Sequence, residues 1–97
     1  MLDHNKKMKE FLQANGIICE PHYIPDGSMR GTWRLTGRAD RRAKLFDDRY
    51  QKWTPELEIK LDGLGFKDFD GKPLNQYSGN GGFFSIFVRS PIEVKNL

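Results

Sequence analysis

Disulfide bonds cannot hold this chain together, because Cys19 is its only cysteine. A small domain without such a cross-link is typical of reducing compartments rather than of secreted proteins. Long hydrophobic runs are also missing. The longest, Phe83–Val88, has six residues and is interrupted by Ser85, whereas a membrane span needs about 20. The first ten residues hold lysines with no hydrophobic stretch behind them, unlike a signal peptide. We therefore expect a soluble cytoplasmic protein that contacts no membrane.

Histidine is scarce as well, and this limits metal and nucleophile chemistry. Cys19 and His22 have the two-residue gap of a zinc half-site, but only His4 remains to join them, and a structural zinc site needs four ligands. A nucleophilic site would need a hydroxyl or thiol beside a histidine that an acid orients, and nothing in the spacing favours one. We expect no metal, no cofactor and no enzymatic activity.

Two glycine-containing segments resemble ligand-binding loops only in part. The segment from Asp68 to Gly71 begins like a calcium loop, but the position of the essential bidentate glutamate is Gly79. The glycines at 79–82 precede a predicted strand, whereas phosphate-binding glycine loops precede a helix. A turn over 68–73 and a hairpin turn at Asn80-Gly81 explain both segments.

The apolar fraction is low, at 37 %, and 30 % of the residues are charged. The chain compensates with seven Phe, two Trp and three Tyr, each of which buries a large area. We expect one domain over residues 1–97 with a core built mainly from aromatic side chains, and a loose C-terminal tail from about residue 91.

Two helices have clear sequence signals. In residues 4–14, Met8, Phe11 and Leu12 share one face, and Asn15-Gly16 supplies a stop. In residues 55–64, a Thr-Pro-Glu start and a closing glycine at 65 delimit the helix. A third helix over 39–50 follows from an apolar stripe, although short strands around a turn at 47–48 are the alternative.

Three segments have strand signals. Residues 17–24 contain Pro21, which places the strand at a sheet edge or a bulge. Residues 30–36 alternate, with Trp33 and Leu35 on one face and Thr32, Arg34 and Thr36 on the other. A turn at 25–28 joins these two segments into an antiparallel hairpin. Residues 83–89 are apolar on both faces, which indicates a strand in the middle of a sheet or under a helix.

Together these elements predict an α+β fold. We expect a two-layer sandwich: an antiparallel sheet of three to four strands, with two or three helices mainly on one face.

The distribution of charge is the most informative feature of the chain. The net charge is only +3, but residues 30–44 have a local net charge of +5 and residues 45–70 one of −3. Such an asymmetry matters because charges add to a local field that acts on partners.

Arginine dominates the basic segment, and guanidinium groups form bidentate bonds to phosphates and stack on bases. We therefore predict a small basic DNA-binding or RNA-binding module that contacts the phosphate backbone through the hairpin and the following segment. The candidate contact residues are Arg30, Thr32, Arg34, Arg38, Arg41, Arg42 and Lys44. In the alternative, a protein-interaction or inhibitor module of the phage or mobile-element type acts on a nucleic-acid-handling protein. A third interpretation gives the arginines no partner except the acidic segment at 45–70.

Overall fold

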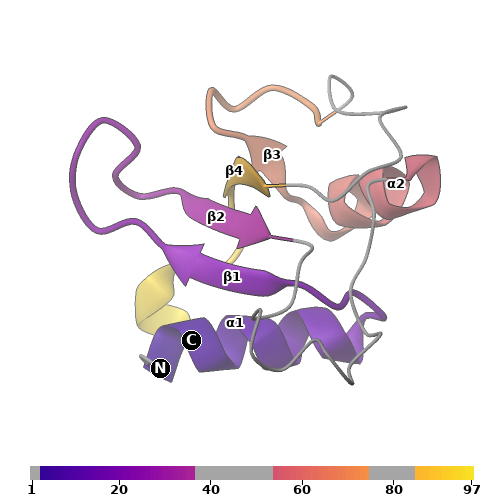
Figure 1. Ribbon diagram of the computed structural model, residues 1–97, viewed down its shortest axis with the longest axis horizontal. Helices are drawn as coiled ribbons and strands as arrows, with labels where there is room; N and C mark the ends of the chain where they lie inside the picture. The colour runs from indigo at the N-terminus through magenta and orange to yellow at the C-terminus, as the bar shows by residue number, and fades with distance from the viewer. Residues whose placement is uncertain (1–2, 37–53, 75–84) are drawn as a thin grey trace.

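The computed structural model describes residues 3–36, 54–74 and 85–97, and this part of the chain has an α+β fold (Figure 1). Its helices are α1 (Asp3–Ala14), α2 (Pro55–Leu64) and the short 3-10 helix η2 (Val94–Asn96). Its strands are β1 (Glu20–Tyr23), β2 (Trp33–Thr36), β3 (Lys67–Asp68) and β4 (Ser85–Arg89). They form one antiparallel sheet in the order β1-β2-β4-β3. The predicted α+β class with an antiparallel sheet is thereby confirmed.

The predicted hairpin is present as β1 and β2, which pair antiparallel with Pro21 opposite Leu35 and Tyr23 opposite Trp33. Both strands are shorter than predicted: residues 17–19 and 24 lie outside β1, and residues 30–32 lie outside β2. The predicted central strand is also confirmed, because β4 lies between β2 and β3. It covers Ser85–Arg89, and the two predicted positions before it lie outside the described residues. Strand β3 was not predicted, because its two residues leave no room for an alternating pattern.

Strand β1 is an edge strand, as Pro21 predicts, and the N-H groups along its free side are accounted for. Ile24 N donates to Thr32 O toward β2, at 2.9 Å, so the alternate residues Tyr23 and Pro21 face away from β2. Proline has no N-H, and Tyr23 N donates to the Asn5 side chain of α1 at 3.0 Å. This arrangement leaves no free donor there for another strand to pair with.

Helix α1 has nearly the predicted limits, with Met8 and Leu12 buried on the predicted face. It ends where the Asn-Gly pair predicts. Gly16 adopts a φ of 77°, and Ile17 N donates back to Leu12 O at 2.8 Å. A positive φ of this kind is readily reached only by glycine.

Helix α2 has the predicted limits. The Thr54 side chain accepts a hydrogen bond from Leu57 N at 3.1 Å, which is the geometry of an N-cap. At the other end, Gly65 has a φ of 101° and its N-H donates to Asp62 O, while Phe66 N donates to Leu61 O. Both end signals in the sequence are therefore used in the fold.

One face of the sheet and both helices contribute to a single buried cluster. Its members are Met8, Leu12, Ile17, Cys19, Trp33, Leu35, Leu57, Leu61, Phe66, Leu74, Ile86 and Val88. The prediction of a mainly aromatic core is wrong for the described residues, because only Trp33 and Phe66 in this cluster are aromatic. Several other aromatic residues are only partly buried, among them Phe87 on the opposite face of β4.

The C-terminal segment differs from the predicted loose tail. Val94 and Leu97 pack against the core cluster, and the Lys7 ammonium donates to Leu97 O at 3.3 Å. Figure 1 shows this segment returning to the N-terminal part of α1. Strand β4 does end just before Pro91, but Val94 and Leu97 beyond it bury apolar surface against the core cluster.

The predicted helix at 39–50 and the predicted turn at 78–82 lie outside the described residues. The two-layer arrangement therefore stays a prediction.

Candidate nucleic-acid interface

The side of the sheet opposite the core carries a cluster of basic and aromatic residues. Because successive residues of a strand point to opposite faces, the residues that alternate with the buried ones share this side. They include His22 on β1, Arg34 on β2, Phe87 and Arg89 on β4, and Lys67 on β3, which together we call the outer-face cluster. All are exposed except Phe87, which is half-buried.

The strand register brings these residues into two rows. His22 pairs with Arg34, and Arg34 pairs with Phe87, so one row crosses three strands. Lys67 pairs with Arg89 in a second row. Side chains of directly opposed residues start about 5 Å apart, and those of diagonal neighbours about 7–8 Å apart. Arg34, Arg89 and Lys67 are therefore neighbours of Phe87 on the same side of the sheet.

The pair formed by Lys67 and Arg89 is unfavourable by itself, because like charges directly opposed across two strands destabilise a sheet. The Arg89 guanidinium donates from Nε to Phe69 O at 2.7 Å, which orients it but does not neutralise it. Two cations held together in this way form a site that an anion would stabilise.

Ion pairs within residues 3–36, 54–74 and 85–97 do not involve the cations of the outer-face cluster. The pairs present are Lys9 with Glu20, Lys72 with Asp70 and Lys95 with Glu93. Arg30 and Arg34 are exposed, and within the same part of the chain neither pairs with an acidic residue. The interpretation that the arginines only pair with the acidic segment therefore finds no support at these two positions.

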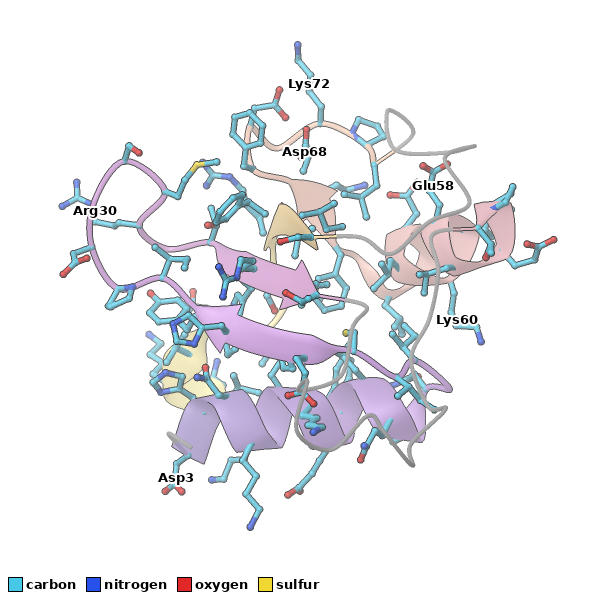
Figure 2. The ribbon with its side chains drawn as sticks, in the orientation of Figure 1. Asp3, Arg30, Glu58, Lys60, Asp68 and Lys72 are labelled. Carbon is cyan, nitrogen blue, oxygen red and sulfur yellow. The ribbon has the colours of Figure 1, made fainter. Side chains whose placement is uncertain are left out.

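The predicted contact residues are placed in different ways. Arg30 lies in the loop between β1 and β2 and points away from the sheet (Figure 2). Arg34 lies in the outer-face cluster. Thr32 is only 3 % exposed, and its hydroxyl donates to Met29 O at 2.7 Å, so this residue serves the turn. Arg38, Arg41, Arg42 and Lys44 lie outside the described residues.

Of the outer-face cluster, only Arg34 was predicted as a contact residue; His22, Phe87, Lys67 and Arg89 were not. A signal for Arg89 was present, since it alternates with Ile86 and Val88 in the same way as Phe87. Lys67 had no such signal, because only strand pairing places it beside Arg89.

Cys19 and His22, two of the three residues considered for metal binding, differ in burial. Cys19 belongs to the core cluster, while His22 is exposed on the other side of the strand. Burial, with a smaller contribution from the Glu20 charge, raises the pKa of the Cys19 thiol to about 12. Among the described residues, no three histidine, cysteine, aspartate or glutamate side chains are grouped to hold a metal ion.

His4 lies in an aromatic group on the core side of the hairpin. Its ring centroid is 5.4 Å from that of Tyr23 and 5.9 Å from that of Trp33, and both contacts are edge-to-face. The His4 ring is therefore used in packing against the sheet.

The predicted Asp-Gly turn is confirmed. Gly71 N donates to Asp68 O at 2.8 Å, and Lys72 N donates to the Asp70 carboxylate at 3.0 Å. The Asp70 carboxylate thus accepts within its own turn, as expected of a structural turn.

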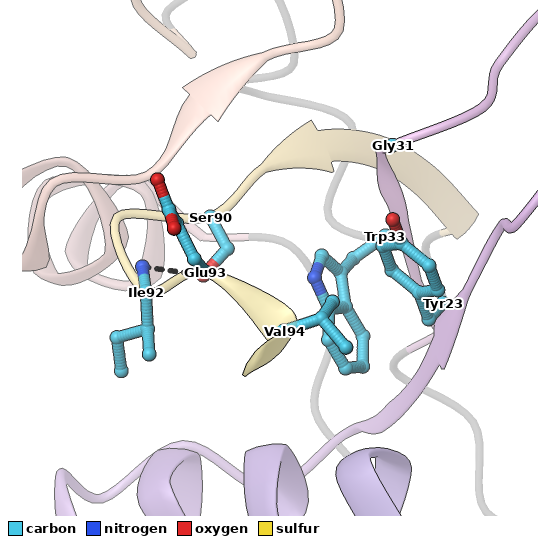
Figure 3. Close-up of a pocket in the computed structure, with 7 residues that line it drawn as sticks. All are labelled: Tyr23, Gly31, Trp33, Ser90, Ile92, Glu93 and Val94. Atoms are coloured by element: carbon cyan, nitrogen blue, oxygen red, sulfur yellow. Dashed lines mark hydrogen bonds between the residues drawn. The ribbon is translucent and has the colours of Figure 1, made fainter. Parts of the chain in front are cut away.

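A hollow of about 220 Å³ lies at the end of the hairpin (Figure 3). Trp33 lines this hollow but is only 1 % exposed. The Ser90 hydroxyl, also in the lining, accepts a hydrogen bond from Ile92 N at 2.9 Å. The remaining walls of the hollow come from Tyr23, Gly31, Ile92, Glu93 and Val94.

In comparisons with known proteins, no family model, no curated protein and no solved structure matches this chain. In the described part of the chain, neither helix has the length and apolar character needed to cross a membrane.

Proposed function

We propose that this protein is a small basic module that binds nucleic acid through the phosphate backbone. The observation that carries the proposal is the outer-face cluster, in which Arg34, Lys67 and Arg89 are exposed on one side of the sheet without an acidic partner among the described residues. Arginine and lysine on one surface are the usual electrostatic footprint of a nucleic-acid-binding protein.

The sequence extends this footprint on both sides of β2. Arg30 precedes the strand, and the basic residues Arg38, Arg41, Arg42 and Lys44 follow it in the chain. We propose that these residues add phosphate contacts to those of the outer-face cluster. Phosphate contacts position a protein without reading sequence, so we expect little preference for one base sequence over another.

The test is the salt dependence of binding to labelled DNA and RNA between about 50 and 200 mM salt, where each phosphate contact contributes about 0.7–0.9 to the slope of log K against log salt. Replacing Arg34, Lys67 and Arg89 together by Gln should reduce this slope by about 2 to 3. Glutamine is used because it keeps part of the side-chain stem that packs on the sheet.

The matched control replaces Lys6, Lys60 and Lys95 by Gln, which removes the same charge from exposed positions on α1, α2 and η2. This control should lower affinity only slightly and leave the slope nearly unchanged. Absence of binding at the lowest salt, or equal losses in the two triple variants, would refute the proposal.

A second candidate function, docking onto an acidic protein surface, is favoured by Phe69. This ring is 41 % exposed, and its backbone carbonyl holds Arg89. An exposed aromatic beside a cation is a common interface anchor. Recovery of one specific acidic protein after nuclease treatment, together with no affinity for nucleic acid, would favour this function.

A further inference from the structure

We infer that the ligand of the outer-face cluster is single-stranded nucleic acid, with one base stacked on the ring of Phe87. This inference rests on the proposed function and deepens it by naming the class of nucleic acid. It depends on the position of an aromatic ring that phosphate binding alone does not require.

Phe87 occupies an unusual position for a large apolar residue. Its neighbours Ile86 and Val88 point into the core, so the Phe87 ring lies on the outer face of β4, at the centre of the sheet. It is half-buried, and both described helices contribute their buried residues to the opposite side of the sheet. The exposed part of the Phe87 side chain therefore lies on the outer face, beside the cations of the outer-face cluster.

The surroundings of Phe87 indicate what that partner is. Arg34 lies directly opposite it on β2, and Arg89 lies two residues further along the same face of β4. Cations beside an aromatic ring match a strand whose phosphates alternate with bases. A base can stack on the ring while the flanking guanidinium groups bind phosphates.

Duplex DNA fits this arrangement less well. Its bases are stacked on one another inside the helix, so a ring lying on a flat sheet face cannot reach the flat surface of a base without opening the duplex. A single strand exposes its bases, and stacking on an aromatic ring tolerates any base. The geometry therefore favours single-stranded over double-stranded nucleic acid.

The experiment compares a labelled thymidine 12-mer, a uridine 12-mer and a 12-base-pair duplex in one buffer. We expect the wild-type protein to bind the single strands more tightly than the duplex. Phe87→Leu should weaken single-strand binding by about five- to fiftyfold, because stacking is lost while an apolar side chain remains. Its salt slope should stay unchanged, since no phosphate contact is removed.

Two further variants separate stacking from other effects. Phe87→Tyr keeps a ring and should keep the affinity, whereas Ile59→Ala removes an apolar side chain that is 70 % exposed on α2 and should change nothing. If Phe87→Leu fails to fold, ultraviolet cross-linking of the wild-type protein to the thymidine 12-mer provides the test. Peptide mapping should then locate an adduct on Phe87.

The outcomes distinguish the inference from the function on which it rests. Salt-dependent binding that Phe87→Leu does not weaken, equal binding of duplex and single strands, or adducts only at other residues would overturn the inference and leave the proposed function standing. Absence of binding to every nucleic acid would overturn both.

Discussion

At the scale of single residues, burial decides which of the chemically capable side chains are available. Cys19 and His22 are three positions apart in the sequence, yet Cys19 is in the core while His22 is exposed and hydrogen-bonds to the Asn5 side chain. Thr32 and Arg34 are two positions apart, yet the hydroxyl of the first is bound to Met29 O while the guanidinium of the second is exposed. Residue type alone therefore gives only candidates.

Cys19 provides a prediction at this scale. Its pKa of about 12 in the fold exceeds the ordinary value of 9.0, so the folded protein favours the neutral thiol. The free energy of unfolding that this preference contributes is fully present below about pH 9 and is lost as the pH rises toward 12. Between pH 9 and 10.5 we expect a loss of about 1–2 kcal/mol from this group, measured by urea unfolding.

The control for this prediction is Cys19→Ala. The variant should be less stable than the wild type at pH 8, because it leaves a small cavity, but its stability should fall less steeply above pH 9. Equal slopes for the two proteins would contradict the prediction. Alkylation of Cys19 at pH 8 should also be slow in buffer and fast in urea, since the thiolate is the reactive form.

At the scale of elements, the ends of the helices explain why short segments fold where they do. Helix α2 begins at the Thr54 cap and ends at Gly65, whose left-handed conformation lets the chain turn back toward β3. Gly65 also lies close to another segment, since a Cβ atom built there would be 3.0 Å from the Pro91 side chain. This contact connects the end of α2 with the residues that follow β4.

Gly65→Ala should therefore destabilise the protein by about 2–3 kcal/mol. Roughly 1–2 kcal/mol comes from the positive φ and the remainder from the contact with Pro91. Gly71→Ala is the matched control, because Gly71 also has a positive φ, of 86°, but a Cβ atom there meets nothing within 4 Å. We expect the control to lose only the cost of the positive φ, about 1–2 kcal/mol in urea unfolding. Equal losses would show that the contact with Pro91 contributes nothing.

At the scale of the whole molecule, the outer-face cluster contains a pair of like charges that lowers the stability of the sheet and that the proposed function would use. Lys67 and Arg89 come from segments that are 22 positions apart, and strand pairing places their like charges side by side. We attribute this arrangement to anion binding, because sheet stability alone would favour an acidic residue at one of the two positions. The cluster thus links the arrangement of the fold to the ligand that we propose.

Lys67→Glu should separate these two requirements. The new carboxylate would face Arg89 across the strands and raise the free energy of unfolding by about 0.2–1 kcal/mol, while nucleic-acid affinity falls. Urea unfolding and binding titrations measure the two effects. In an Arg89→Gln background the gain in stability should vanish, and in about 1 M salt it should shrink, because exposed charges are screened. A loss of both stability and affinity would contradict this account.

The sequence by itself determined the local features of this protein. The limits of α1 and α2, the hairpin, the edge position of β1 and the central position of β4 all follow from signals within a few residues, such as the Thr-Pro start, the closing glycines and Pro21. Such signals can be read because caps, turns and alternation act over short distances along the chain.

Only the tertiary structure decided which residues lie together. The pairing of β3 with β4 brings Lys67 beside Arg89, and the register of β2 and β4 places Arg34 opposite Phe87. The segment after Pro91 packs against the core through Val94 and Leu97. The sequence could not supply these contacts, because the pairing of distant strands depends on how the whole chain buries its apolar surface. Cys19 shows the same division: as the single cysteine of the chain it excludes a disulfide within it, but only the fold shows that its thiol is buried.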